Sequence, residues 1–363
     1  MTVDGHRPYR IAVDAMGGDH APRAIVEGAV LAVEEFPLQV ILVGQEQAIR
    51  PELERFPQAL STIQIQPAAD VIEMNETPSQ ALRRKRNSSV QVALDLVKRG
   101  EAQAAVTAGN TGAALAASML VLRPLKGIDR PAIATFLPTA TPKGISILLD
   151  AGANVDCRGS QLFQFGLMGS VYAQHALEVE SPRVGLLSIG EEDTKGNEAS
   201  KEAYQLLSKS SLNFIGNIEG KEVFQGKAEV IVCDGFTGNV ALKIGESLAE
   251  MFEKMLREAF TASWRTKLAY LLVRPHLQAF KKRVDYSEYG GAPLLGVNGI
   301  CIIGHGRSSA KAIKNAIGLS QRLVEKDLNG CIRAGSELNS ELQEAKEPKK
   351  RFWRPRKGPT SAS

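Results

Sequence analysis

The sequence has few cysteines, and their spacing excludes a disulfide framework and a zinc site. The four cysteines, at positions 157, 233, 301 and 331, include no C-x-x-C pair. The first ten residues contain no apolar core and do not resemble a secretory signal peptide. We therefore expect a protein of the reducing cytoplasm.

The sequence also lacks the motifs of several catalytic classes. Its five histidines include no H-x-x-x-H pair, and there is neither a Walker A motif for phosphoryl transfer nor a G-x-S-x-G nucleophile elbow. Residues 304–309 (GHGRSS) come close to a dinucleotide fingerprint but lack its third glycine. We expect neither a metal ion nor a cofactor.

Charged residues are missing from residues 102–122, a run long enough to raise the question of a membrane span. The centre of this run is Thr-Ala-Gly-Asn-Thr-Gly, which would make a poor lipid-facing helix. We expect a buried strand, a loop and a helix there instead.

What is present is an alternation of apolar strands and helices over 363 residues, 44% of them hydrophobic. We expect strands at residues 11–14, 40–44, 62–66, 104–108, 133–137, 145–149, 184–189, 230–233 and 301–303. This alternation predicts an α/β fold with a doubly wound, mostly parallel sheet and ligands beyond the carboxyl ends of its strands. The turn at residues 141–144 predicts a local antiparallel pairing, and the last helix is expected to end near Leu328. We expect a single domain over residues 1–340, with a helical hairpin at about 240–290, and a basic, disordered tail over residues 341–363.

The first candidate site lies in residues 11–20 (IAVDAMGGDH). A buried strand ends on an acid, two glycines allow a tight turn, and a proline follows that suits the first turn of a helix. Backbone N–H groups at such a place bind anions and reacting carbonyls. A plain turn with a helix cap is the alternative. The candidates are Asp14, Gly17, Gly18, Asp19 and His20.

Three further loops follow expected strands and open helices: residues 107–112, 188–198 and 234–239. Their side chains could hold an anionic oxygen, neutralise phosphate or polarise a carbonyl. Ordinary helix capping and, for residues 188–198, a solvated loop are the alternatives. Cys233 could be a nucleophile, but packing at the end of a buried strand is favoured. The candidates are Asn110, Thr111, Gly112, Lys195, Asn197, Asp234, Thr237, Gly238 and Asn239.

A basic run, residues 83–86 (RRKR), precedes a pair of serines that can open a helix. Lys85 together with Ser88 and Ser89 could form a phosphate clamp. A solvated charged face is the alternative.

Loops rich in Gly, Asn, Thr and Lys at helix N-termini suit a reaction between two groups that are already reactive. Ionised phosphate is a competent nucleophile at neutral pH, and a thioester is an activated acyl donor. Their reaction needs positioning, charge neutralisation and oxyanion stabilisation rather than a strong base or a covalent intermediate.

Residues 240–283 combine large apolar residues with basic ones. Residues 240–260 form a strongly amphipathic helix, and Pro275 is expected to break the segment that follows. We expect a helix–helix contact of a dimer, or a contact with an anionic membrane surface or an acidic carrier protein. Charge concentrated here and in the tail favours such partners over nucleic acid. The basic residues of the hairpin are Arg265, Lys267, Arg274, Lys281, Lys282 and Arg283.

Seven motifs, in family order, resemble the phosphate acyltransferases that start bacterial phospholipid synthesis (PlsX). They are VDAMGGDHAP (13–22), LRRKRNSSV (82–90), TAGNTGA (107–113), LLDAGAN (148–154), SIGEEDTKGNE (188–198), CDGFTGN (233–239) and YGGAPLLGVNG (289–299). The resemblance does not extend to the basic tail of residues 341–363. It implies a phosphotransacetylase- or isocitrate-dehydrogenase-like fold, a homodimer and peripheral association with the inner face of the cell membrane.

The resemblance further implies transfer of an acyl chain from acyl-carrier protein to inorganic phosphate, with the acyl phosphate passing to a membrane glycerol-phosphate acyltransferase. The expected phosphate ligands are Lys85, Ser88, Asn110 and Thr111. The expected donors to the thioester oxyanion are Lys195 and Asn197. The residues expected to shape and close the cleft are Asp14, Asp19, His20 and Asn239. A coenzyme-A-dependent phosphotransacetylase and a non-catalytic membrane scaffold are the alternatives.

Overall fold

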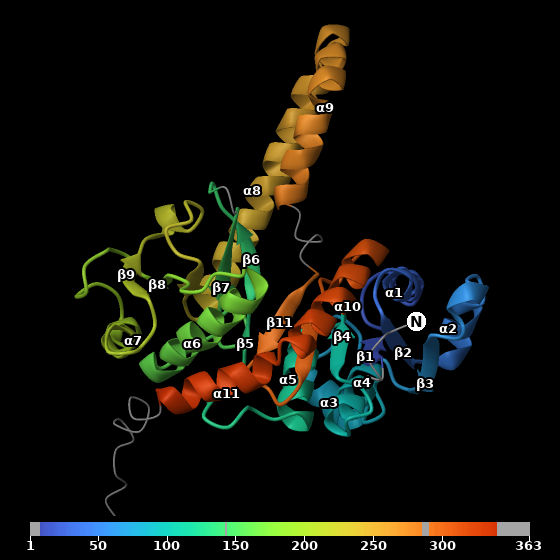
Figure 1. The fold of residues 1–363 in the computed structure, drawn as a ribbon. Helices are drawn as coiled ribbons and strands as arrows, with labels where there is room; N and C mark the ends of the chain where they lie inside the picture. Colours follow the sequence, from blue (N-terminus) through green and yellow to red (C-terminus); the bar gives the residue numbers. More distant parts are fainter. Residues whose placement is uncertain (1–7, 142–143, 285–289, 340–363) are drawn as a thin grey trace, which may run out of the picture.

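The computed structural model describes residues 8–141, 144–284 and 290–339, and the side chains of residues 279–284 lie outside that description. Figure 1 shows two α/β halves side by side, with a long helical hairpin rising above them. The basic tail predicted for residues 341–363 lies outside the described residues.

The first half contains a seven-stranded sheet in which β3, β2, β1, β4 and β12 run parallel, β11 pairs antiparallel with β12, and β5 pairs antiparallel with β11. In spatial order its strands are β3 (Ile63–Pro67), β2 (Leu38–Gly44), β1 (Tyr9–Asp14), β4 (Ala104–Thr107), β12 (Ile300–Ile303), β11 (Ala292–Leu295) and β5 (Ala132–Ile133). We call it the first sheet.

The second half contains a five-stranded sheet with one antiparallel pair, β6 with β7, and three parallel pairs. Its strands are β6 (Thr135–Pro138), β7 (Ile145–Leu149), β10 (Val230–Val232), β8 (Val184–Leu187) and β9 (Phe214–Ile218). The mostly parallel α/β fold is confirmed, and so is the antiparallel pairing of the strands on either side of the predicted turn. The strands form two sheets, however, rather than the one sheet that we expected.

Helices cover both faces of the first sheet, because alternate strand residues point to opposite sides. Ile11 and Val13 belong to one apolar cluster, and Ala12 between them belongs to another. The helices on the first side are α1 (Arg23–Glu35), α2 (Glu46–Leu53) and α10 (Ala310–Glu325). On the second side lie α3 (Pro78–Arg84), α4 (Ser89–Lys98) and α5 (Thr111–Val121). The sheet is doubly wound, as predicted.

The second sheet is covered on one face by α6 (Gly159–Ala176) and α7 (Glu198–Ser208). Helix α11 (Leu328–Leu338) packs on α6, and two short 3-10 helices, η1 (Pro57–Ala59) and η2 (Gly220–Glu222), complete the body. The largest apolar cluster contains side chains of both halves, among them Ile11 of β1 and the fully buried Phe163 of α6. The two halves therefore share core packing.

The hairpin consists of α8 (Gly235–Thr261) and α9 (Trp264–Val284), which pack against each other. Phe260 and Tyr270 are in ring contact across the pair, with 5.6 Å between their centroids. The predicted break at Pro275 is wrong, because α9 runs through this residue. A proline removes one helical hydrogen bond, and on this exposed helix water can bind the freed carbonyl. Within the described residues, no helix combines the length and apolar character that crossing a membrane requires.

Two other boundaries differ from the expectation. The strand expected at residues 133–137 is split, since β5 pairs with β11 of the first sheet and β6 pairs with β7 of the second. The last helix was expected to end near Leu328, but α10 ends at Glu325 and the backbone takes a left-handed conformation at Asp327, which has a φ of 44°. The Asp327 side chain caps α11, an element that the sequence did not predict.

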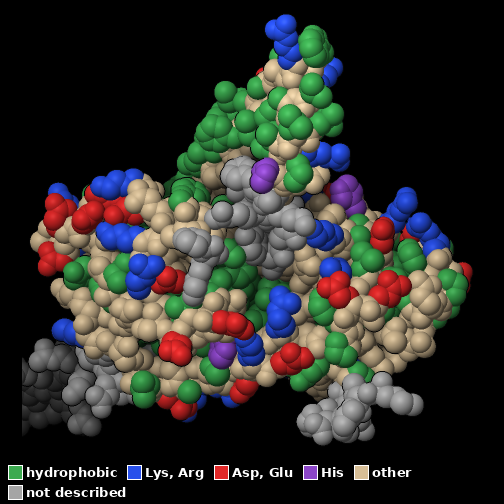
Figure 2. Space-filling view, turned by 45° about the horizontal axis from the view of Figure 1, so that its top comes forward, with side chains coloured by type: hydrophobic (Ala, Val, Ile, Leu, Met, Phe, Trp, Pro, Cys, Tyr) green, Lys and Arg blue, Asp and Glu red, His purple; other side chains and the backbone are tan. Residues whose placement is uncertain are grey.

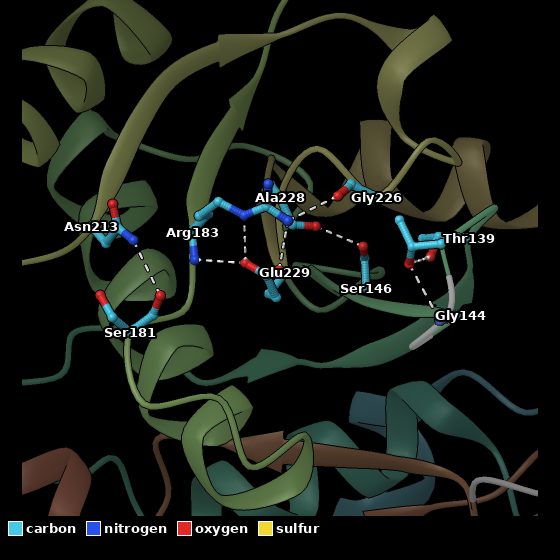
Figure 3. Close-up of polar contacts among 10 residues, drawn as sticks. Thr139, Gly144, Ser146, Ser181, Arg183, Asn213, Gly226, Ala228 and Glu229 are labelled. Carbon is cyan, nitrogen blue, oxygen red and sulfur yellow. Dashed lines mark hydrogen bonds and ion pairs between the residues drawn. The ribbon is translucent and has the colours of Figure 1, made fainter.

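An ion pair between Arg183 and Glu229 joins the residues that directly precede β8 and β10, at the end of the second sheet where these parallel strands begin (Figure 3). The Arg183 guanidinium donates to both carboxylate oxygens of Glu229, at 2.7 and 3.0 Å, and to the Gly226 carbonyl at 3.0 Å. Burial alone would raise the pKa of Glu229, but hydrogen bonds from the side chain and backbone N–H of Arg183 outweigh it and hold the pKa below its usual value. This contact lies at the strand ends opposite to the candidate loops.

Replacing Glu229→Gln should lower the free energy of unfolding by about 1 kcal/mol at pH 7, because charged hydrogen bonds are lost from a partly exposed pair. The folded-state pKa is depressed, so the stabilisation is present above the unfolded pKa and disappears as the pH falls through the folded value. In urea unfolding, the difference between variant and parent should therefore be larger at pH 7 than at pH 3. The exposed control Glu180→Gln should match the parent at both pH values; a Glu229→Gln deficit that is as large at pH 3 as at pH 7 would contradict this account.

Candidate active site

The first polar loop follows β1 at the point where the strand order of the first sheet reverses. From β1 the chain passes to β2 and β3 on one side, whereas β4 and β12 lie on the other side. Loops that leave parallel strands at such a point diverge, and ligands bind in the crevice between them. The sheet therefore brings the candidates of residues 14–20 next to those of residues 107–112.

A buried carboxylate joins these two loops. Asp14, 3% exposed, accepts a hydrogen bond from the Thr107 hydroxyl at 2.7 Å and another from the Met16 backbone N–H at 3.2 Å. Burial raises the pKa of Asp14, and hydrogen bonds from Ser89, Thr107 and the following backbone oppose that rise. The carboxyl group of Asp14 thus holds two loops in place.

Close backbone contacts extend this arrangement to a third loop. A Cβ atom on Gly17 would lie 2.7 Å from both the Asp14 carboxylate and the backbone nitrogen of Gly109, so only glycine fits. The Asp19 backbone N–H donates to the Gly306 carbonyl at 2.8 Å. Residues 304–309, whose sequence comes close to a dinucleotide fingerprint, are therefore part of the same group of loops. The candidates Gly18, Asp19 and His20 lie on its rim, the last two with exposed side chains.

Asn110 is the N-cap of α5, as the capping alternative proposed. Its Oδ1 accepts from the Ala113 backbone N–H at 3.0 Å, and its Nδ2 donates to the carbonyls of Met74 and Glu76. The candidates Thr111 and Gly112 form the first turn of this helix, and a Cβ on Gly112 would lie 2.8 Å from Pro78. Asn110 therefore attaches a fourth segment, residues 70–78, to the site.

Lys85 is held by an ion pair beside the site. Its ammonium donates to Glu76 at 2.5 Å and to the Val71 carbonyl at 2.6 Å. The hydrogen bond from Lys85 lowers the pKa of Glu76. A phosphate would have to displace Glu76 from this ammonium. The role predicted for Lys85 stays a prediction.

The two neighbouring serines differ in orientation, which the sequence did not reveal. The Ser88 hydroxyl is fully buried and donates to Gln91 at 2.9 Å, whereas Ser89 hydrogen-bonds Asp14. Ser89, and not Ser88, lines the hollow between the loops. In this conformation the hydroxyl of Ser88 is not available as a phosphate ligand.

The hollow itself is small. Its volume of about 10 Å³ is enough for one water-sized group, such as a single oxygen atom of a larger anion. Ile72, Val90 and Ala113 give it apolar walls among the polar groups. The complete lining is Asp14, Met16, Gly17, Ile72, Ser89, Val90, Thr107, Gly109, Asn110 and Ala113.

A second buried carboxylate, which we did not single out as a site residue, lies where the two sheets meet. Asp150 follows β7 and accepts hydrogen bonds from the backbone N–H groups of Ala153 and Asn154 and from Ile133 of β5 in the other sheet. Burial raises the pKa of Asp150, and these hydrogen bonds act against it. The available signal was similar to that of Asp14: an apolar strand that ends on an acid, followed by Ala and, within three residues, Gly.

The long helix begins before residue 240, where we expected it to start. Helix α8 begins at Gly235 because Asp234 is its cap, accepting from the backbone N–H and the hydroxyl of Thr237 at 2.8 and 2.9 Å. Asn239 and Gly238 therefore lie inside the helix, and a Cβ on Gly152 would lie 3.5 Å from Asn239. The Cys233 thiol is buried and burial raises its pKa, in agreement with a packing role.

Residues 188–198 lie at the carboxyl ends of the second sheet. Asn197 caps α7, accepting from the Ser200 backbone N–H at 2.8 Å, and the exposed Lys195 packs beside Gly190. Asn217 of β9 donates to the Glu192 carbonyl at 2.7 Å. These contacts fix the loop to the second sheet; they do not extend to the hollow at Asp14.

The candidates thus form one group around Asp14 in the first sheet and a second group on loops that follow strands of the second sheet. Ala151 and Leu242 of the second group belong to the same apolar cluster as Ala113 and Ala114 at the start of α5. Within the described ranges, no three His, Cys, Asp or Glu side chains gather as metal ligands do. The hairpin cations Arg265, Lys267 and Arg274 are exposed on α9; the side chains of Lys281, Lys282 and Arg283 lie outside the described part.

Solved structures with the same fold include two phosphotransacetylases. One, from Streptococcus pyogenes, has a TM-score of 0.62 at 16% identity over 88% of this chain and 94% of its own length. Another, from Staphylococcus aureus, has a TM-score of 0.59 at 15% identity over 87% of this chain and 94% of its own. The fold of this chain is therefore that of the phosphotransacetylases.

The family model described as fatty acid synthesis protein matches residues 9–330. A phosphate acyltransferase of Pelotomaculum thermopropionicum is 55% identical over 90% of this chain and 95% of its own length. One from Geobacter sulfurreducens is 52% identical over 88% and 92%. The chain belongs to this family, which confirms the resemblance seen in the motifs.

Gly17→Ala should destabilise the fold by about 1–3 kcal/mol and lower activity about a hundredfold, because the added methyl group forces apart the backbones of two loops. Thermal unfolding and steady-state kinetics measure the two effects. The matched control is Gly220→Ala, where a Cβ meets nothing within 4 Å. Equal activity in both variants would show that the contact between Gly17 and Gly109 does not shape the site.

Proposed function

We infer that this chain is a phosphate acyltransferase, which transfers the acyl group of acyl-acyl-carrier protein to inorganic phosphate. The observation that carries the inference is the match to phosphate acyltransferases at 55% and 52% identity over nearly their whole length. The products are acyl phosphate and free carrier protein. The acyl phosphate then serves a membrane glycerol-phosphate acyltransferase in phospholipid synthesis.

The reaction needs little from the protein beyond positioning and charge stabilisation. A phosphate oxygen attacks the thioester carbonyl carbon, which forms a C–O bond and leaves negative charge on the carbonyl oxygen. The C–S bond then breaks, and the proton of hydrogen phosphate passes to the departing thiolate. Donors aimed at the carbonyl oxygen and cations near the phosphate lower the barrier.

The phosphate is assigned to the hollow of the first sheet. One of its oxygens fits the volume between Ser89 and Asn110, and the N-terminus of α5 points backbone N–H groups to the same place. Asp14 lines this hollow, and its two carboxylate oxygens are engaged by hydrogen bonds from Thr107 and Met16. Asp19 and His20 are assigned to the rim.

The thioester carbonyl is assigned to the loop of residues 188–198. The Lys195 ammonium is exposed there, and Asn197 leaves the remaining N–H groups of the first turn of α7 free to meet an oxyanion. Asp150 supports the assignment because it ties the second sheet to the first, so that phosphate and thioester can be held in one cleft.

A coenzyme-A-dependent phosphotransacetylase is the rival with the same fold. The direct test supplies purified protein with phosphate and either acyl-acyl-carrier protein or acyl-coenzyme A and traps acyl phosphate as its hydroxamate. A clear preference for the carrier protein supports our inference. A preference for coenzyme A would support the rival. If neither donor gave product, the non-catalytic membrane scaffold would be the remaining alternative.

The hairpin is assigned to assembly and to the membrane surface. Figure 2 shows hydrophobic side chains over much of it. On α8 they form a row that contains Ile244, Leu248, Met251, Phe252, Met255 and Leu256, all 43–57% exposed. We assign this row to a second copy of the chain, and Trp264, Arg265 and Lys267 at the far end to an anionic lipid surface.

Lys195→Ala should lower kcat about a hundredfold or more, as removal of an oxyanion donor does, while the unfolding midpoint stays unchanged. The Lys195 side chain is exposed, so its loss leaves no cavity. Hydroxamate assays and thermal unfolding test this, with the exposed Lys201→Ala of α7 as the control. Near-normal turnover in Lys195→Ala would remove the assignment.

Two hairpin variants should separate assembly from membrane binding. Met251→Glu with Met255→Glu places charge in the apolar row and should halve the molar mass measured by light scattering. Arg265→Glu with Lys267→Glu should keep the mass but weaken sedimentation with vesicles of anionic lipid, by about 1 kcal/mol per cation removed. A mass that resists the first change, or vesicle binding that resists the second, would contradict the respective assignment.

A further inference from the structure

The basic run at the end of α3 has a surplus of charge that the site does not use. Lys85 turns inward to Glu76, but Arg83, Arg84 and Arg86 are exposed. In the part of the chain that the structure describes, these guanidinium groups form no ion pair or hydrogen bond; Arg84 exerts only a weaker attraction on Glu76. Three cations on one short segment thus face solvent.

The carboxylates of the neighbouring loop do not neutralise this patch. Asp70 accepts from the Asn87 backbone N–H at 3.2 Å, and Glu76 is engaged by Lys85. Glu73 is the remaining acid of residues 70–76 and is exposed. The arginine patch, which we define as Arg83, Arg84 and Arg86, therefore keeps an excess of positive charge.

The arginine patch lies at the rim of the hollow. Pro78 at the start of α3 touches Gly112 of α5, and Ser89, which lines the hollow, follows the patch by three residues. The Asn110 side chain fixes residues 74–76 from the other side. A protein bound to the arginines would sit directly beside the site.

The cations of the hairpin do not have this position. Helix α8 has 27 residues, which corresponds to a length of about 40 Å. Arg265 and Lys267 follow its far end. A carrier protein bound at that end would hold its thioester about one helix length from Asp234 and the loops of the site.

We propose that the acyl-carrier protein docks through an acidic surface on Arg83, Arg84 and Arg86, and that its thioester arm passes over the adjacent hollow, where the phosphate is assigned, toward the loop of residues 188–198. This rests on the proposed function and names the surface by which the site receives its donor. Guanidinium groups bind carboxylates through two parallel hydrogen bonds and attract an acidic partner from a distance, so they speed encounter.

The test compares donors with and without the carrier protein. In Arg83→Glu with Arg84→Glu, kcat/KM for acyl-acyl-carrier protein should fall about 10–100-fold and lose most of its dependence on salt. With an acyl-pantetheine thioester, which has no carrier protein, kcat/KM should stay within about twofold of the parent. The control Lys209→Glu with Arg333→Glu changes the net charge equally at exposed positions and should leave both donors unaffected.

The outcomes are distinct. Equal loss with both donors would place the arginines in the chemistry of the site and overturn the docking proposal. So would an unchanged rate with the carrier protein, or a carrier-specific loss found only in Arg265→Glu with Lys267→Glu. If the parent enzyme forms no acyl phosphate from either thioester, the proposed function itself fails. Circular dichroism of each variant shows that it is folded.

Discussion

The hydrogen bond between the Thr107 hydroxyl and the buried Asp14 carboxylate is the contact on which the site depends. It joins the ends of β1 and β4, where the strand order reverses and two loops would otherwise separate. With the carboxylate fixed there, Gly17 can approach Gly109 backbone to backbone, and the loops of residues 70–78 and 304–308 close around them. An unpartnered carboxylate at this depth would be costly, so the contact also specifies the loop conformation.

Asp150 performs the corresponding task between the sheets. It ends a strand of the second sheet, yet one of its oxygens accepts from the backbone of Ile133 in the first sheet. The short strand β5 therefore belongs to one sheet by its pairing and to the other through this carboxylate. Two buried acids thus set the relative positions of the loops: Asp14 within the first sheet and Asp150 across the junction. A reaction between two separately held substrates requires such fixed positions.

The sequence predicted the features that depend on local pattern and missed those that depend on partners. The end of β1 and the tight turn at Gly17 followed from an apolar run and paired glycines. Ser88 and Ser89 could not be told apart, because only the packing of α4 decides which hydroxyl meets Asp14. The splitting of β5 from β6 depends on which distant strand pairs with each, and Pro275 was overridden by the packing of α9 on α8.

The side chains predicted to bind substrate are mostly engaged with the protein itself. Asn110, Asn197 and Asp234 each cap a helix, and Lys85 is paired with Glu76. A cap satisfies only one or two of the four N–H groups at a helix start, so the others remain directed at the space above the strands. Donors supplied in this way are rigid and need no reorganisation when charge develops on the thioester oxygen. The capping and functional interpretations of these residues therefore do not compete, because each capping side chain fixes the backbone N–H donors that the reaction uses.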